Sequence, residues 1–475
     1  MDRTVAWTKL KDDKKVTRFA SEYQNYLNQS KTERECVAAS VALAEKGGFL
    51  NLKEVIKEQR TLKPGDRVYR SWMNKSLMMF IVGNSPIETG MNILGAHIDS
   101  PRIDVKQNPL YEDSGLAYLD THYYGGIKKY QWVALPLAIH GVIIRKDGTK
   151  ADVVVGEDPK DPVFCISDLL PHLSQEQMEK KAARIIEGEA LNLLIGGRPI
   201  PEKVGKGKKD EKEEKVKDPV KQNILSLLKE KYDIEEEDFL SAELEIVPAG
   251  TARDLGFDRS MILGYGHDDR CCAFPSLRAM TDYEGVPEYT LCCILTDKEE
   301  IGSVGATGMA SHFFENVTAE FIGCLGAYSD LTLRRCLLES RMLSSDVSAG
   351  YDPEFASAFE KKNAAYLGKG ICFNKFTGSR GKSGSNDANP EFMAMIRGIL
   401  DADAVCYQTA ELGRVDLGGG GTIAFLCAKY GMNVIDSGLP VLSMHAPWEV
   451  ISKIDLYEGY RCYNAFLAHA HPLDN

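Results

Sequence analysis

The chain has 475 residues, of which 44% are hydrophobic and 27% are charged, and this ordinary balance excludes collagen, coiled-coil and largely disordered classes. The 69 acidic residues outnumber the 57 lysines and arginines, and the net charge of −12 argues against a nucleic-acid partner. Apolar runs such as residues 133–139 are far shorter than the roughly 18 residues of a membrane helix, so no membrane partner is expected.

Twelve cysteines are the one unusual feature of the composition. Two adjacent pairs, Cys271-Cys272 and Cys292-Cys293, lie in apolar runs, and Cys-x-x-Cys does not occur, so a zinc ribbon is not indicated. The N-terminal residues show no charged-then-apolar export signal. We therefore expect a cytoplasmic protein whose thiols are free and mostly buried.

The N-terminal part predicts a helix followed by strands. Thr32 and Glu35 have the spacing of a capping box, an apolar run follows them, and Gly47-Gly48 would end the helix. Residues 77–82 and 91–97 are short apolar runs typical of buried strands.

Residues 104–247 differ in character from the rest of the chain. Short apolar runs alternate there with turn signals such as Asp147-Gly148, which predicts a β-rich insertion. Inside it, residues 202–221 interleave lysines with acidic residues and predict a charged, solvated loop. Length alone suggests about three domains. The pattern instead predicts two, a discontinuous domain of residues 1–103 and 248–475 and an inserted domain of residues 104–247.

From residue 260 onward, predicted strands alternate with predicted helices. The strands are expected at residues 289–295, 319–327, from 405 onward, and 434–444, and the helices at 273–280, 390–400 and 421–429. Alternation of this kind is typical of an α/β sheet covered by helices.

Histidines and carboxylates recur where apolar runs end. His97 with Asp99, the pair Glu299-Glu300, Asp346 and His445 all follow such runs, and in open α/β sheets ligands bind beyond the carboxyl ends of the strands. Asp268 and Asp269 precede an apolar helical run, where acidic residues also suit a helix N-terminus. Glu299-Glu300 alone would equally suit an acidic surface turn. Together, two histidines and three carboxylates suit a pair of divalent ions, zinc or alternatively cobalt or manganese.

These residues and their neighbours resemble the aspartyl aminopeptidase/aminopeptidase I family of di-zinc metallopeptidases, along nearly the whole chain. The stretches that carry the resemblance are Gly95-Ala96-His97-Ile98-Asp99-Ser100-Pro101-Arg102, Asp268-Asp269-Arg270, Asp297-Lys298-Glu299-Glu300-Ile301-Gly302-Ser303, Ser345-Asp346, the glycine-rich run Asp416-Leu417-Gly418-Gly419-Gly420-Gly421-Thr422, and Met444-His445. The resemblance implies a hydrolase, a metalloprotease that removes the N-terminal residue of peptides. It also implies an α/β catalytic domain with a mixed central sheet between helices, interrupted by a dimerisation domain, and assembly of the dimers into a homododecamer.

The resemblance further implies a role for each site residue. Asp268 bridges two zinc ions, His97 and Asp346 complete one metal site, and Glu300 and His445 complete the other. Two other carboxylates support the reaction: Glu299 as the general base and Asp99 as the partner of the His97 ring. His172 resembles a histidine that family members lend to the neighbouring subunit, although a surface histidine is an equal alternative.

One position departs from the pattern of the acidic-preferring members. They carry a lysine in a Gly-x-x-Ile-Lys-x-Asn segment, and the corresponding residues 368–374 here place Cys372 at that position. A thiol cannot form the charge-assisted hydrogen bond to a substrate carboxylate. Unless Lys369 or Lys375 reaches the site, we expect a preference for neutral or apolar N-terminal residues, with an aspartyl- or glutamyl-preferring enzyme as the alternative.

Two other functions remain open at this stage. A di-metal carboxypeptidase or deacylase would need a cationic site for a C-terminal carboxylate, which the sequence does not reveal. An inactive assembly scaffold would not need to keep the five ligands and the base. A nucleotide-binding loop at residues 378–383 is excluded, because Phe376 stands where the Walker pattern requires glycine.

Overall fold

The computed structural model of the protein describes residues 5–10, 13–201 and 216–473. The chain divides into two compact units, one formed by Met1–Ser100 with Ala252–Asn475 and the other by Pro101–Thr251. The predicted insertion, residues 104–247, begins three residues later and ends four residues earlier than the second unit. Residues 202–215, most of the predicted charged loop, lie outside the described residues.

A nine-stranded mixed sheet forms the centre of the first unit, in the order β1-β2-β3-β13-β4-β14-β18-β16-β17. The strands are β1 (Leu50–Asn51), β2 (Arg67–Trp72), β3 (Ser76–Ile81), β4 (Asn92–His97), β13 (Leu291–Thr296), β14 (Arg341–Ser345), β16 (Ile371–Asn374), β17 (Tyr407–Thr409) and β18 (Asn433–Gly438). The four neighbours β13, β4, β14 and β18 are parallel, with Thr296 opposite His97 and Ser344 opposite Gly95. Their carboxyl ends therefore lie at one edge of the sheet.

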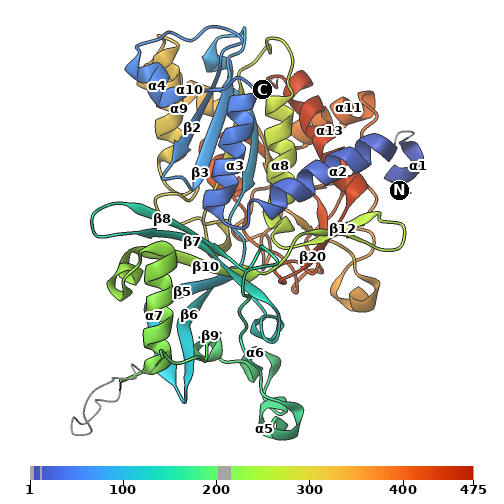
Figure 1. The fold of residues 1–475 in the computed structure, drawn as a ribbon. Coiled ribbons are helices and arrows are strands. Elements are labelled where there is room, and N and C mark those ends of the chain that lie inside the picture. Colours follow the sequence, from blue (N-terminus) through green and yellow to red (C-terminus); the bar gives the residue numbers. More distant parts are fainter. Residues whose placement is uncertain (1–4, 11–12, 202–215, 474–475) are drawn as a thin grey trace, which may run out of the picture. The chain divides into compact units, whose positions relative to one another are not determined.

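Helices cover both faces of this sheet (Figure 1). Alternate side chains of each strand enter separate cores, so that Leu77 and Met79 join one cluster and Met78 and Phe80 the other. The helices of the first face are α2 (Asp13–Asn28), α3 (Glu33–Lys46), α8 (His267–Thr281), α11 (Pro390–Ala402) and α13 (Lys453–His469), and those of the second are α4 (Leu52–Lys57), α9 (Phe313–Cys324), α10 (Asp330–Leu338) and α12 (Ala424–Ala428). The short α1 (Ala6–Lys9) packs near α13. The predicted α/β fold with a mixed sheet between helices is thus confirmed.

A smaller five-stranded sheet also belongs to the first unit, in the order β11-β12-β20-β19-β15. Its strands are β11 (Arg253–Leu255), β12 (Met261–Gly264), β15 (Ser348–Ala349), β19 (Pro440–Leu442) and β20 (Glu449–Ser452). The chain passes from β12 directly into α8. The strands β19 and β20 pair with one another and flank residue 445.

The second unit is built on a six-stranded antiparallel sheet in the order β8-β7-β10-β5-β6-β9. Its strands are β5 (Arg102–Asp113), β6 (Leu116–Tyr124), β7 (Leu137–Ile144), β8 (Lys150–Val155), β9 (Leu193–Gly196) and β10 (Ala242–Pro248), and its helices are α5 (Gln175–Met178), α6 (Ala182–Ile185) and α7 (Pro219–Tyr232). The end of the predicted charged loop, residues 219–221, instead begins α7. Pro219 suits the first turn of a helix, and Glu112 accepts hydrogen bonds from the free backbone N–H groups of Val220 and Lys221.

Two further predictions can be compared with the elements. The capping box of α3 is confirmed, because the Thr32 hydroxyl accepts from Glu35 N–H while the Glu35 carboxylate accepts from Thr32 N–H. The strand predicted at residues 319–327 is wrong, since residues 313–324 form α9. Its apolar residues Phe314, Val317 and Phe321 have helical spacing and bury one face of the helix. No helix in the described ranges is long and apolar enough to cross a bilayer.

Candidate metal centre

The parallel strands of the large sheet deliver four acidic or imidazole side chains to one edge. His97 is the last residue of β4, Asp346 follows β14, and Glu299 and Glu300 follow β13 on a 3-10 turn, Glu299–Ile301. Gly438 on β18 permits the close approach of Asp346, because a Cβ at that position would lie 1.9 Å from the Asp346 carbonyl oxygen. These residues lie close together because the parallel strands end at the same edge of the sheet, which is the rule on which the sequence prediction rested.

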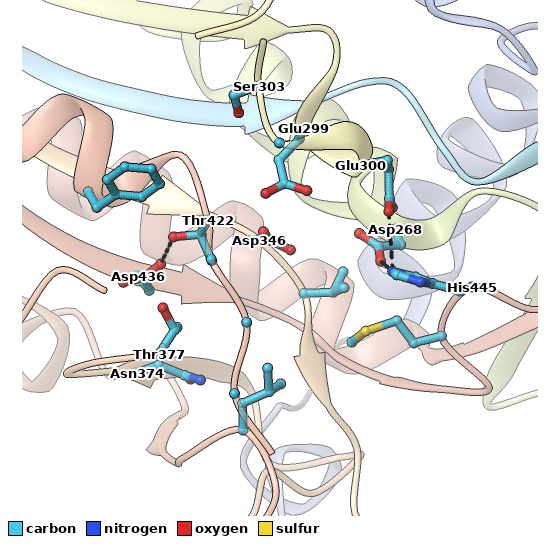
Figure 2. A pocket seen from close by; sticks show the side chains of 18 residues that line it. Asp268, Glu299, Glu300, Ser303, Asp346, Asn374, Thr377, Thr422, Asp436 and His445 are labelled. Carbon is cyan, nitrogen blue, oxygen red and sulfur yellow. Dashed lines mark hydrogen bonds and ion pairs between the residues drawn. The ribbon is translucent and has the colours of Figure 1, made fainter. Parts of the chain in front are cut away.

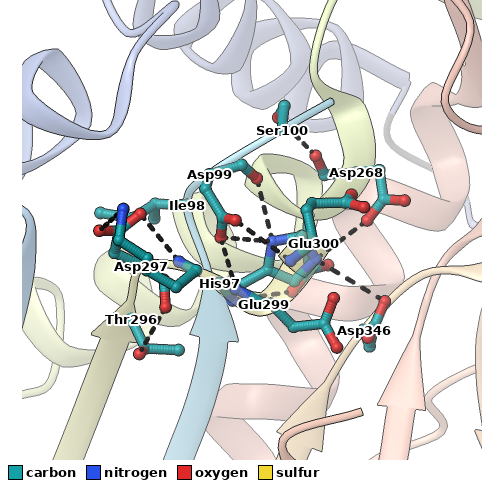
Figure 3. Close-up of polar contacts among 12 residues, drawn as sticks. His97, Ile98, Asp99, Ser100, Asp268, Thr296, Asp297, Glu299, Glu300 and Asp346 are labelled. Carbon is teal, nitrogen blue, oxygen red and sulfur yellow. Dashed lines mark hydrogen bonds and ion pairs between the residues drawn. The ribbon is translucent and has the colours of Figure 1, made fainter. Parts of the chain in front are cut away.

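Asp268 lies between the two histidines of this site. Its Oδ1 atom is 3.1 Å from His97 Nε2, and its Oδ2 atom is 3.2 Å from His445 Nε2. Asp346 Oδ1 lies 3.9 Å from His97 Nε2 (Figure 3). Glu300 Oε2 lies 3.4 Å from His445 Nε2 (Figure 2). The two oxygens of the Asp268 carboxylate therefore face two different histidines.

The donor set fits zinc. Two imidazole nitrogens and three carboxylates are ligands that zinc prefers, and the side chains of His97, Asp268 and Glu300 are at most 4% exposed. Glu300 Oε1 is buried without a hydrogen-bond partner. Buried carboxylates this close together repel one another unless cations compensate their charge.

Burial and neighbouring carboxylates raise the pKa of Glu300 and of Asp346 well above their usual range. Burial also acts on Asp268, but hydrogen bonds with His445 and His97 outweigh it and hold its pKa below the ordinary value. Burial raises the pKa of Glu299 to about 7, although His97 opposes the shift.

Asp99 holds the turn that carries both glutamates. Its Oδ1 accepts from Glu299 N–H and its Oδ2 from Glu300 N–H, each at 3.1 Å (Figure 3). The His97 Nδ1 atom lies 3.0 Å from the Asp99 carbonyl oxygen and 3.4 Å from Asp99 Oδ1. Asp99 therefore orients the imidazole, as the sequence suggested, and also fixes two further residues that the sequence did not connect to it.

Glu449 performs a similar task on the other side of Asp268, and the sequence analysis missed it. This residue at the start of β20 is 1% exposed. Its Oε2 accepts from Asp268 N–H at 3.1 Å and its Oε1 from His445 N–H at 2.7 Å. The only sequence signal is a glutamate four positions after His445, which by itself is too common to indicate a role.

Arg270 holds the loop beyond His97. Its guanidinium is 1% exposed and donates to the carbonyl oxygens of Ile98, at 3.3 Å, and Lys31, at 3.0 Å. Ser100 Oγ donates to the Asp268 carbonyl oxygen at 2.7 Å. The backbones of the His97 loop and of the first turn of α8 are thus joined directly.

A cavity of about 470 Å³ opens onto these residues (Figure 2). Its acidic side chains are Asp268, Glu299, Glu300, Asp346 and Asp436, its apolar ones are Val347, Leu412, Phe425 and Met444, and its remaining lining residues are Gly302, Ser303, Asn374, Thr377, Gly419, Gly420, Gly421, Thr422 and His445. No lysine or arginine is among them.

The remaining predicted residues lie elsewhere. His172 belongs to the second unit, where it is exposed on the 3-10 turn Pro171–Leu173. Cys372 is fully buried on β16, where its thiol donates to Asn374 Oδ1 at 3.4 Å. Asn374 lines the cavity and Cys372 does not. Neither Lys369 nor Lys375 lines it, and Lys375 pairs with Asp387 at 3.3 Å.

Comparisons with known proteins identify the family of the chain. The family model described as aminopeptidase I zinc metalloprotease (M18) matches residues 26–467. A probable M18 family aminopeptidase 1 of Clostridium acetobutylicum is 58% identical over 464 residues, covering 97% of each chain.

Solved structures give the same result. The aminopeptidase I of Clostridium acetobutylicum matches with a TM-score of 0.90 at 55% identity, covering 98% of this chain and 99% of that one. The M18 aminopeptidase of Thermotoga maritima matches with a TM-score of 0.92 at 40% identity, covering 99% and 100%. The yeast mApe1 dodecamer, at 20% identity and a TM-score of 0.74 over 95% and 96%, shares the fold. The chain therefore belongs to the M18 family of aminopeptidase I zinc metalloproteases, which are peptide-bond hydrolases.

Proposed function

We propose that the protein is a di-metal aminopeptidase with zinc as its ion, cobalt and manganese being the alternatives. The observation that carries this proposal is the position of Asp268, whose two oxygens face His97 and His445 separately. Asp346 would complete the site of His97, and Glu300 would complete the site of His445. Zinc bound by these residues would act as a Lewis acid on the scissile carbonyl and on the attacking water.

Glu299 would act as the general base. Its carboxylate lines the cavity beside the proposed ligands His97 and Asp346, where it can accept a proton from a water and return it. In the reaction, Glu299 would take a proton from the attacking water and then give it to the nitrogen of the leaving amine. Asp99 would keep this carboxylate in place through the Glu299 backbone.

The acidic lining supports exopeptidase action on non-acidic residues. A free α-ammonium group is attracted to Glu299 and Asp436, the lining carboxylates that are not proposed zinc ligands, whereas an acylated N-terminus lacks this charge. An aspartyl or glutamyl side chain would meet the same carboxylates and no lysine or arginine of the lining. Neutral or apolar side chains would contact Leu412, Phe425 and Met444.

A panel of aminoacyl anilides tests this function. We expect leucyl and methionyl anilides to be cleaved with at least about 100-fold higher kcat/KM than aspartyl and glutamyl ones, since a missing polar partner for a buried charge costs several kcal/mol. N-acetylated leucyl anilide, the control, should remain intact. Faster cleavage of the acidic substrates would contradict the preference, and no cleavage with zinc, cobalt or manganese would contradict the enzyme.

Glu449→Gln should weaken zinc binding without removing any ligand. The amide keeps one acceptor oxygen but turns an N–H₂ group toward a backbone N–H of Asp268 or His445, so the two ligands lose their common support. Loss of such a supporting hydrogen bond typically costs about 10- to 100-fold in metal affinity. Competition with a chromophoric chelator measures this effect.

Asp455→Asn is the matched control for Glu449→Gln. Asp455 on α13 is also fully buried and also accepts two backbone N–H groups, from Gly368 and Gly370 at 2.7 Å, but it lies outside the cavity lining. This variant should lose stability and keep its zinc affinity. An equal loss of affinity in both variants would show that Glu449 acts only through general stability.

Assembly and location are also part of the proposal. The fold shared with the yeast mApe1 dodecamer supports a homododecamer, in which the second unit would form dimers and the exposed His172 could reach a neighbouring subunit. The twelve cysteines, which all lie in the described part of the chain, form no disulfide, and this suits a reducing cytoplasm.

A further inference from the structure

Asp436 is a buried carboxylate in the cavity that the proposed reaction does not use. It lies on β18, is 3% exposed and lines the cavity. Thr422 Oγ1 donates to its Oδ1 at 2.5 Å, and its Oδ2 has no hydrogen-bond partner. A buried carboxylate oxygen without a partner destabilises the fold, so this oxygen is suited to accept a hydrogen bond from a bound ligand.

Polar atoms surround this carboxylate at one side of the cavity. Asn374 on β16 is the direct cross-strand neighbour of Asp436, and Thr377 follows on the same segment. Both line the cavity, and the Thr377 hydroxyl is also buried without a partner. Figure 2 shows Thr422 and Asp436 on the opposite side of the cavity from Asp268, Glu300 and His445. A side chain that crosses the cavity from the metal centre would therefore point toward them.

From this arrangement we propose that Asp436 selects N-terminal residues whose long aliphatic side chain ends in a cation, above all lysine. This inference rests on the proposed function and extends its preference among non-acidic substrates. The methylene groups of lysine make the same contacts with Leu412 and Phe425 as an apolar side chain. Its ammonium group would donate to Asp436 Oδ2 and to the Thr377 hydroxyl, the two acceptors that lack a partner.

The charge of the cavity agrees with this choice. Of its five acidic lining residues, Asp436 alone is neither a proposed zinc ligand nor the proposed base, so that a lysine side chain would supply the opposite charge beside it. Burial raises the pKa of Asp436 to about 7, with the Thr422 hydrogen bond opposing it, and a cation beside it would favour the ionised form. A neutral side chain would leave both acceptors unpaired.

Lysyl and norleucyl anilides form the direct test, because norleucine has the lysine stem without the ammonium group. We expect the zinc-loaded enzyme to cleave the lysyl anilide with about 10- to 100-fold higher kcat/KM. Asp436→Asn should remove this ratio, because lysyl cleavage should fall more than norleucyl cleavage. Asp455→Asn, which alters a buried carboxylate outside the cavity, should keep the ratio.

Binding provides a readout without turnover. Calorimetry with L-lysine hydroxamate and L-norleucine hydroxamate should show the same ratio in the wild type and its loss in Asp436→Asn. If norleucyl substrates and ligands are preferred or equal in the wild type, the inference is wrong while the proposed function stands. If no aminoacyl anilide is cleaved with any of the three metals, the proposed function fails and this inference with it.

Discussion

Glu299→Gln is expected to lower kcat/KM by about 10³-fold while zinc remains bound. The amide has nearly the same size as the carboxylate but cannot accept the proton of the attacking water. The backbone hydrogen bond from Glu299 to Asp99 does not involve the side chain and should persist. Steady-state kinetics on leucyl anilide, together with zinc analysis of the same sample, measure both quantities.

The matched control for this change is Glu284→Gln, which neutralises an exposed glutamate outside the cavity. It should leave kcat/KM unchanged. Glu299→Asp keeps a carboxylate one methylene shorter and should retain more activity than Glu299→Gln. Activity of Glu299→Gln within tenfold of the wild type would show that another group takes the proton.

Asp268→Ala is expected to lose both zinc ions. Its two oxygens face His97 and His445 at 3.1 and 3.2 Å, so one substitution removes a ligand from each proposed site. Loss of binding should also lower the melting temperature measured in zinc, because a metal at 100 times its Kd stabilises the native state by about 2.7 kcal/mol. Elemental analysis and thermal unfolding with and without chelator measure these changes.

His445→Ala separates the two sites. It should weaken the site of Glu300 and leave the site of His97 and Asp346 occupied, so the zinc content should fall by about half. If Asp268→Ala and His445→Ala lose the same amount of zinc, the carboxylate of Asp268 does not bridge two ions.

The site residues at the strand ends could be predicted from the sequence, because the carboxyl ends of parallel strands lie at one edge of a sheet. His97, Glu299 and Asp346 follow apolar runs, and parallel neighbours necessarily place such residues at one edge. The sequence could also predict the capping box of α3, since that motif involves residues only three positions apart. The strand predicted at residues 319–327 was wrong because a short apolar run does not distinguish a strand from a buried helix. In the structure this run belongs to α9, and its Phe321 ring stacks on Phe80 of the sheet.

The supporting residues could not be predicted for a different reason. Glu449 contacts Asp268 and His445 through their backbone N–H groups, which carry no side-chain signature. The contact with Asp268 spans 181 positions, and the Asp436–Thr422 pair depends on how one strand and one loop meet. Such contacts arise from the assembled sheet and from no local pattern in the chain.

The burial of the cysteines has a consequence for the chemical resistance of the enzyme. Ten of the twelve are buried, and burial raises the pKa of Cys36 and Cys271 to about 11 and that of Cys293 and Cys427 to about 12. Oxidants and alkylating reagents attack the thiolate, which is scarce at such pKa values. Reagents should therefore reach the partly exposed Cys165 and Cys324 first. The rate at which the other ten thiols are modified would then measure how often the native fold opens.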